Sequence, residues 1–130
     1  MTDPIGDFLT RIRNGYLAGK KTIEVPHAKI KEKIGEILVK EGYLKGMEVE
    51  GKKPQEKKLV LSLKYPKKKP AIIGIKRVSK PGVRLYTKTD KIPRVRWGKG
   101  LVILSTPGGL MTDKEAKKKK LGGEVICQVW

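Results

Sequence analysis

The chain has 130 residues, of which 31 are lysine or arginine and 13 are aspartate or glutamate, and its formal net charge is +18 at pH 7. This length suits one domain or two small ones, and such an excess of positive charge is typical of proteins that bind a polyanion. A single cysteine excludes an intramolecular disulfide, and no apolar run approaches the ~20 residues that cross a bilayer.

The first predicted element is a helix that begins at Pro4. Asp3 and Pro4 form a typical helix start, because an aspartate caps the exposed N–H groups and a proline suits the first turn. Apolar residues then recur at helical spacing and define an inner face, namely Ile5, Phe8, Leu9, Ile12 and Tyr16. Arg11, Arg13 and Asn14 lie mostly off that face.

A short strand at residues 22–25 and a second helix at about residues 27–41 follow, and Gly42 ends this helix. The helical pattern turns four apolar residues inward, namely Ile30, Ile34, Ile37 and Leu38. It turns three lysines outward, namely Lys29, Lys31 and Lys33. A solvated helix face is the commoner role of such lysines, and contact with phosphate is the alternative.

Two further strands and a connector complete the first half. Residues 43–50 and 58–65 alternate in polarity around a charged loop, which predicts a pair of strands. Three lysines enclosed by Pro66 and Pro70 then predict an extended connector.

This connector is the expected domain boundary. We predict an N-terminal α/β domain at residues 1–65, a linker at residues 66–70 and a C-terminal β-rich domain at residues 71–130. Residues 1–65 hold 14 basic and 9 acidic residues, whereas residues 66–130 hold 17 and 4. The second half should therefore make most of the contacts with a polyanion.

The second half begins with strand candidates at residues 71–77 and 83–88. Arg84, Tyr86 and Lys88 share one face of the second candidate, because side chains alternate along a strand. An aromatic ring between two cations suits stacking on a base or sugar beside phosphate contacts. A tyrosine that completes a sheet face explains the same pattern equally well.

Residues 100–116 are the most informative stretch. The apolar run at residues 101–104 predicts a buried strand that ends at Ser105. A tight loop follows, made of Thr106, Pro107, Gly108 and Gly109. Thr112 and Glu115 have the spacing of a capping box, so a helix should come next. Such a loop would present two hydroxyls and glycine N–H groups, although the spacing alone favours a structural turn.

The chain closes with a basic run at residues 117–120, which suits a helix end, and with a strand after Gly122 and Gly123. Cys127 belongs to the apolar alternation of that strand, so we expect it in the core. The predicted fold is of the mixed α/β (α+β) class, with an N-terminal α-β-α-β-β unit and a C-terminal, mostly antiparallel β unit with one short helix.

The sequence argues against an enzyme, a metal site or a cofactor site. His27 is the only histidine, and Cys127 lies in a predicted buried strand, so a catalytic Cys–His pair is not expected. The sequence has no His/Cys cluster for zinc and no P-loop motif for a nucleotide.

Several blocks of sequence, in order, match a known family. They lie at residues 2–5, 9–14, 74–82, 92–95, 103–116 and 122–130. Over essentially its whole length, the chain resembles the bacterial type of the eighth protein of the small ribosomal subunit.

The resemblance implies a protein of two small α/β domains that binds the central domain of small-subunit rRNA directly and supports its assembly. It implies neighbouring small-subunit ribosomal proteins as partners, a monomer outside the ribosome and a cytoplasmic location. The latter fits the lone cysteine and an N-terminus without a signal-peptide pattern. Members of that family also repress their own operon, so the operon mRNA is a further candidate partner. No membrane and no small-molecule substrate are implied.

The resemblance also implies particular RNA contacts. The principal ones are Ser105, Thr106, Gly108, Tyr86, Arg84, Gly122, Gly123 and Glu124. Secondary ones are Thr2, Arg11, Arg13, Asn14, Lys29, Lys31 and Lys76. The chain departs from the family at Pro107, where the family usually has serine, and at Trp97, where a polar or basic residue is more common.

Two other classes share the high positive charge. An architectural, nucleoid-type DNA-binding protein is the first alternative, but it should lack a structured hydroxyl-rich loop and show a dimerising element. An adaptor for an acidic protein is the second, and the net charge of +13 after residue 65 exceeds what most protein interfaces carry. Competition between structured rRNA and duplex DNA at equal salt separates the first alternative from an rRNA-binding protein.

Overall fold

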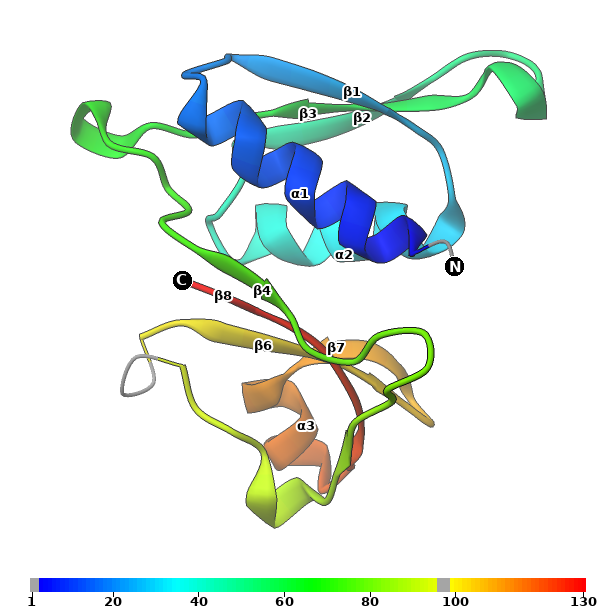
Figure 1. The fold of residues 1–130 in the computed structure, drawn as a ribbon, viewed down its shortest axis with the longest axis vertical. Coiled ribbons are helices and arrows are strands. Elements are labelled where there is room, and N and C mark those ends of the chain that lie inside the picture. Colours follow the sequence, from blue (N-terminus) through cyan, green and yellow to red (C-terminus); the bar gives the residue numbers. More distant parts are fainter. Residues whose placement is uncertain (1–2, 96–98) are drawn as a thin grey trace. The chain divides into compact units, whose positions relative to one another are not determined.

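The computed structural model describes residues 3–95 and 99–130, which form two compact units (Figure 1). One unit is Asp7–Ile72, and the other combines residues 3–6 with Ile73–Trp130. Each unit packs helix against antiparallel strands, which confirms the predicted mixed fold class. Within the described residues, no helix has the length and apolar content needed to cross a membrane.

The first unit is a three-stranded antiparallel sheet with two helices on one of its faces (Figure 1). Its elements are α1 (Pro4–Leu17), β1 (Thr22–Pro26), α2 (Lys29–Lys40), β2 (Gly46–Glu50) and β3 (Lys58–Ser62). The strand order β1-β3-β2 places β3 in the centre, so β3 supplies the fully buried Leu59 and Leu61. The helices contribute Phe8, Ile12, Ile34 and Leu38 to the core, as their spacing predicted.

The side of α2 that faces the sheet differs from the prediction at two residues. Ile30 is exposed, whereas Lys31 is only 8% exposed and its ammonium group donates to the carbonyl oxygen of Pro26 at 3.4 Å. The helix starts at Lys29, and the buried stripe follows Lys31, Ile34 and Leu38 at helical spacing. The methylene stem of a lysine can pack like an apolar chain while its charged end reaches a carbonyl, so polarity alone misplaced Ile30 and Lys31.

The predicted extended connector is instead a closed loop. A short 3-10 turn covers Pro66–Lys68, with Lys67 and Lys68 at positive φ (51° and 66°). The N–H of Ala71 donates to the carbonyl oxygen of Lys64 at 2.9 Å and ties the two ends of the loop together. Pro66 and Pro70 therefore flank a turn rather than an extended segment. The backbone hydrogen bonds of this turn outweigh the mutual repulsion of the three lysines, which favours an extended chain.

The second unit is built around the last strand of the chain. Its strands are β4 (Ile75–Arg77), β5 (Tyr86–Thr87), β6 (Leu101–Thr106), β7 (Gly109–Thr112) and β8 (Gly123–Val129). The sheet order is β4-β8-β6-β7, and β5 also pairs with β8, so β8 has three antiparallel partners. The strand β7 was not predicted: residues 109–112 pair back onto β6 before the helix begins.

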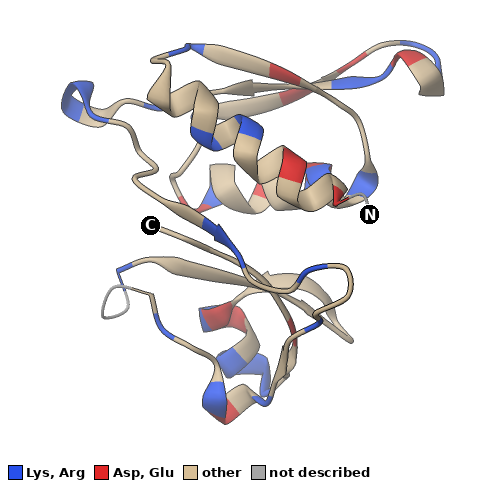
Figure 2. Cartoon of the chain, viewed as in Figure 1, with Lys and Arg blue, Asp and Glu red and all other residues tan. Residues whose placement is uncertain are grey.

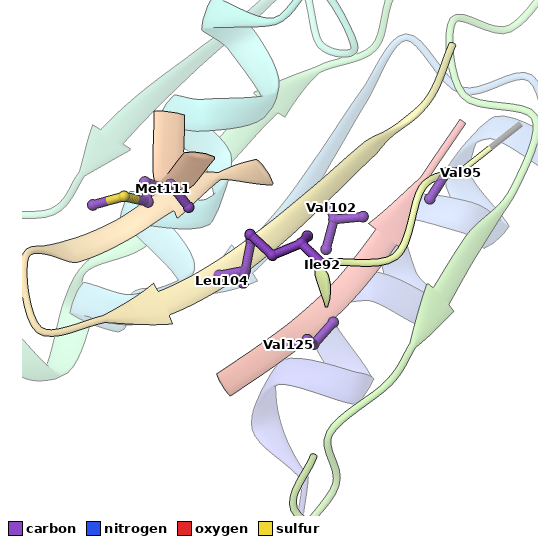
Figure 3. Packing of buried hydrophobic residues seen from close by; sticks show 7 residues of the cluster. Ile92, Val95, Val102, Leu104, Met111 and Val125 are labelled. Atoms are coloured by element: carbon purple, nitrogen blue, oxygen red, sulfur yellow. The ribbon is translucent and has the colours of Figure 1, made fainter. Parts of the chain in front are cut away.

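The short helix α3 (Asp113–Lys119) covers one face of this sheet. The Thr112 hydroxyl accepts from the N–H of Glu115 at 3.2 Å, which confirms the predicted N-cap. The Asp113 carboxylate accepts from the N–H of Val102 at 3.3 Å and ties the helix start to β6. Ala116 then packs into a buried apolar cluster (Figure 3) whose other members are Ile92, Val95, Val102, Leu104, Met111 and Val125.

Asp3, the N-cap residue of α1, also forms an ion pair with Arg77 within the second unit. The Asp3 carboxylate accepts from the N–H of Gly6 and lies 3.3 Å from Nε of Arg77, whose other nitrogen donates to the carbonyl oxygen of Ile126 at 2.9 Å. Partial burial tends to raise the pKa of Asp3, but the bond from Gly6 and the nearby Arg77 and Arg84 together hold it below its ordinary value.

We expect Asp3→Asn to destabilise the protein by about 1 kcal/mol at neutral pH and to have no such effect in acid. Asparagine caps a helix as well as aspartate does, so the change removes the charge and keeps the cap. Because the pKa is lowered in the folded state, the stabilisation is present above the unfolded pKa and is lost as the pH falls through the folded one. Thermal unfolding of Asp3→Asn and of the parent, at pH 7 and below pH 3, measures this loss of stability. An equal difference in stability between the two proteins at both pH values would contradict the prediction.

Candidate nucleic-acid interface

Three of the predicted contact residues form one row across the second sheet. In the strand register, Tyr86 of β5 lies opposite Glu124 of β8, and Glu124 lies opposite Ser105 of β6. Residues directly opposite each other in an antiparallel pair project from the same face. The side chains of Tyr86, Glu124 and Ser105 therefore share one face, although their positions in the sequence span almost forty residues.

Two glycines allow the strands of this row to approach. A Cβ atom at Gly123 would overlap the carbonyl oxygen of Ser105 and would lie 3.0 Å from Cα of Thr106. A Cβ atom at Gly122 would overlap the carbonyl oxygen of Thr87. The start of β8 thus fits between β5 and β6 only without side chains, which gives both glycines a structural role next to the row.

The Glu124 carboxylate is held by two partners. It accepts from the hydroxyl of Ser79 and from a guanidinium nitrogen of Arg84 at 3.0 Å. The Ser79 oxygen in turn accepts from the N–H of Leu85 at 3.2 Å. Glu124 therefore fixes the segment before β5, and Arg84, whose side chain is half exposed, neutralises its charge beside the row.

Ser79 is the residue that the sequence analysis missed. It is fully buried, and its hydroxyl links Glu124 to the backbone before Tyr86. Nothing in the sequence pattern distinguishes it, because its partner Glu124 is 45 residues away in the chain.

Tyr86 exposes 72% of its surface, so its ring is open to a partner. Val83 and Leu85 are exposed as well, at 61% and 45%. The strand β5 contains only two residues, which is shorter than the strand predicted at residues 83–88. The ring of Tyr86 consequently stands on a short edge strand of the sheet, and Arg84 is bonded to Glu124, the residue opposite Tyr86.

The hairpin between β6 and β7 separates the two predicted hydroxyls. The Thr106 hydroxyl donates to the carbonyl oxygen of Gly109 at 2.8 Å and accepts from the N–H of Gly108 at 3.1 Å. Within residues 3–95 and 99–130, the Ser105 hydroxyl has no hydrogen-bond partner. Ser105 is therefore available to a ligand, while Thr106 holds the turn together.

The glycine N–H groups of this turn are less available than the sequence suggested. The N–H of Gly108 is bonded to Thr106, and Gly109 adopts a φ of 105°, a conformation that favours glycine. The bonds that hold this turn are made by Thr106, Gly108 and Gly109, so none of them requires an N–H at Pro107.

Lysines and arginines are spread over the second unit, which also carries the row (Figure 2). The last turn of α3 carries Lys117, Lys118 and Lys119, all exposed, and Lys88 is exposed just after β5. Cys127 belongs to β8 of the same sheet and is fully buried, and this burial raises the pKa of its thiol to about 12, so it has no nucleophilic character at neutral pH.

The secondary contact residues are distributed over both units. Arg11 is exposed on α1 and pairs with Asp7 at 2.9 Å, and it lines a cavity of about 410 Å³ together with Asn14. Arg13 is exposed on the same helix, and Lys29 is exposed at the start of α2. Lys76 is exposed on β4 in the second unit.

Three other positions have a different status. Lys31, predicted as an outward-facing secondary contact, is buried, so its ammonium group is directed to Pro26 rather than to solvent. Thr2 and Trp97 lie outside the described residues.

Comparison with known proteins shows similarity along the full chain. Residues 3–130 match the family model described as "Ribosomal protein S8". A curated protein of Caldanaerobacter subterraneus subsp. tengcongensis named "Small ribosomal subunit protein uS8" is 54% identical over 133 residues, which covers 100% of this chain and 98% of the relative. Proteins of the same name from Persephonella marina and Mycoplasmopsis synoviae are 51% and 50% identical, and they cover 100% of this chain and 99% and 98% of their own length.

A family-model match over nearly all residues and full-length identities of about half confirm the resemblance seen in the sequence. The chain belongs to the ribosomal protein S8 family, whose members are proteins of the small ribosomal subunit.

Proposed function

We propose that this protein is a constituent of the small ribosomal subunit that binds the central domain of small-subunit rRNA directly and supports its assembly. The observation that carries the proposal is the row of Tyr86, Glu124 and Ser105 on one face of the second sheet. The row combines an exposed aromatic ring, a guanidinium bonded to Glu124 and a hydroxyl that has no hydrogen-bond partner among the described residues.

Each group of the row suits a part of an irregular RNA helix. A regular RNA duplex has a major groove too narrow for side chains, so specific contacts are made where bases are unstacked or the minor groove is open. The Tyr86 ring can stack on such a base or its sugar, and the Ser105 hydroxyl can bond to a base edge or a 2′-hydroxyl. Arg84 and the lysines of α3 supply the phosphate contacts that position the RNA.

The Glu124 carboxylate acts indirectly in this proposal. An unpaired carboxylate would repel phosphate, but this one is bonded to Ser79 and Arg84. It fixes the guanidinium and the backbone before Tyr86, so Glu124, Gly122 and Gly123 shape the site rather than touch the RNA.

The remaining expectations follow from the same assignment. The C-terminal domain at residues 71–130 carries the specific contact, and Arg11, Arg13, Asn14, Lys29 and Lys76 add secondary contacts. Neighbouring ribosomal proteins are further partners, and the cytoplasmic ribosome is the place of action. The operon mRNA is a candidate ligand of the same row, because an RNA that imitates the rRNA site would satisfy the same groups.

Competition binding tests the proposal. We expect a transcript of the central domain of small-subunit rRNA to displace labelled specific RNA at least 100-fold more effectively than duplex DNA of equal length at equal salt. Affinity should fall with salt, since each neutralised phosphate contributes roughly 0.7–0.9 to the log–log slope. Equal competition by duplex DNA would favour the architectural DNA-binding alternative and contradict the proposal.

A further inference from the structure

Lysines gather around a groove at one end of the three-stranded sheet in the first unit. The groove has a volume of about 690 Å³, and its lining includes Lys21, Thr22, Lys45, Ser62, Lys64 and Tyr65. These residues lie where the chain enters β1, enters β2 and leaves β3, which is the same end of all three strands. None of them belongs to the row of Tyr86, Glu124 and Ser105.

Backbone hydrogen bonds fix the three lysines relative to one another. The carbonyl oxygen of Lys21 accepts from the N–H of Leu63 at 2.8 Å, and the N–H of Lys45 donates to the carbonyl oxygen of Ser62 at 2.9 Å. The N–H of Lys64 donates to the hydroxyl oxygen of Tyr16 at 3.1 Å. The three Cα positions are therefore set by the fold before any ligand arrives.

The groove offers several hydrogen-bond donors that the protein itself does not use. In the described part of the chain, the ammonium groups of Lys21, Lys45 and Lys64 have no carboxylate or carbonyl partner, and the hydroxyls of Thr22 and Ser62 have no hydrogen bond. Thr22 and Ser62 are opposite each other in the strand register, so their hydroxyls share a face. Such an arrangement of cations and hydroxyls suits a chain of phosphates.

One wall of the groove is apolar and rigid. The Tyr65 hydroxyl donates to the carbonyl oxygen of Lys20 at 2.6 Å, and the ring packs edge-on against Tyr16 with centroids 5.5 Å apart. Leu63, which also lines the groove, is 4% exposed. An apolar wall beside a row of cations matches a sugar–phosphate backbone better than it matches an acidic peptide, which would leave this wall without a partner.

We propose that this groove binds the sugar–phosphate backbone of an RNA strand, as an RNA contact of the first unit that is separate from the row and from the secondary contacts at Arg11, Arg13, Asn14 and Lys29. The choice of RNA as the polyanion rests on the proposed function. The contact reads no sequence, because cations and hydroxyls that face phosphates position an RNA without distinguishing its bases.

A charge-matched pair of triple variants tests the groove. The first replaces Lys21, Lys45 and Lys64 by glutamine, and the second replaces Lys52, Lys53 and Lys57, which are exposed in the loop between β2 and β3. Both lose three charges from the same unit. Dissociation constants for the rRNA central-domain transcript are measured from 50 to 200 mM salt, and thermal unfolding confirms that both proteins fold.

We expect the groove variant to lose about 100-fold in affinity at 0.1 M salt and about 2–3 from the log–log salt slope, because three phosphates lose their counter-charges. The loop variant should lose less than threefold. Equal losses in the two variants, while the parent still prefers rRNA to duplex DNA, would overturn the groove proposal and leave the proposed function intact. Loss of that preference in the parent would instead contradict the proposed function.

Lysine acetylation of the parent protein, with and without the transcript, gives a second measurement that needs no variant. We expect the transcript to protect Lys21, Lys45 and Lys64 and to leave Lys52 and Lys53 reactive. Protection of the groove lysines by polyglutamate at equal charge concentration, but not by the transcript, would assign the groove to an acidic protein and overturn the proposal.

Discussion

Replacing Gly123 by alanine should lower the stability of the protein by about 3 kcal/mol, the largest effect we expect from a single methyl group. The new Cβ atom would overlap the carbonyl oxygen of Ser105 and would lie 2.9 Å from its carbonyl carbon. These are backbone atoms of the neighbouring strand, so they cannot turn aside as a flexible side chain would. The strands β6 and β8 must therefore separate locally, and the row of contact residues spreads with them.

Thermal unfolding measures this effect, with an expected fall in Tm of about 10 °C. Gly46→Ala is the matched control, because Gly46 also lies in a strand and no described atom is within 4 Å of the position that its Cβ would occupy. We expect that control to be neutral or slightly stabilising, since alanine restricts the unfolded chain. Similar melting temperatures for Gly123→Ala and the parent would contradict this prediction, because they would show that the space between β6 and β8 accommodates a methyl group.

Ser105→Ala should weaken binding to the specific rRNA site by about 1–3 kcal/mol, or roughly 5–150-fold, without lowering Tm. The Ser105 hydroxyl has no partner within the described residues, so its removal leaves no protein group unsatisfied. It does leave an RNA group unpaired in the complex. The loss should appear mostly as faster dissociation, because the net charge and the long-range attraction are unchanged.

Thr106→Ala is the informative comparison for Ser105. The Thr106 hydroxyl bonds to both Gly108 and Gly109, so its removal should lower Tm by loosening the turn. The two neighbouring hydroxyls thus separate binding from stability. A Ser105→Ala protein that melts normally and binds the specific RNA as the parent does would show that the hydroxyl makes no RNA contact.

The sequence predicted those elements whose signals are local. The cap at Asp3, the apolar spacing of α1 and the N-cap at Thr112 each lie within a few residues of what they specify, and the structure confirms all three. The buried run before Ser105 was equally clear, because four consecutive apolar residues have few other places to go.

The sequence was less informative where long-range pairing decides the structure. The hairpin strand β7 contains only four residues and ends in a helix cap, so its local pattern was dominated by turn and cap signals. The buried side of α2 depends on Lys31, whose stem packs inward although its charge indicates solvent. The role of Ser79 depends on a partner 45 residues away, and no local pattern encodes such a contact.

The candidate contacts themselves came from the family resemblance, and the structure supplies the physical relation between them. The motif at residues 103–116, Tyr86 and the glycine pair are separate blocks in the sequence. The register of β8 brings the principal members together, since Glu124 is opposite both Tyr86 and Ser105. That register follows from the glycine pair and from the shift between Ile103 and Leu104, neither of which is visible in local periodicity.

Ultraviolet crosslinking of the complex with the rRNA central-domain transcript tests the central claim most directly. After nuclease and protease digestion, mass spectrometry identifies the residues that carry a nucleotide. We expect an adduct on Tyr86 in the parent protein. Tyr86→Ala should abolish this adduct, and Tyr86→Phe tests whether the hydroxyl contributes to it. Adducts confined to other parts of the protein, with none on Tyr86 in a complex that binds specifically, would contradict the central claim.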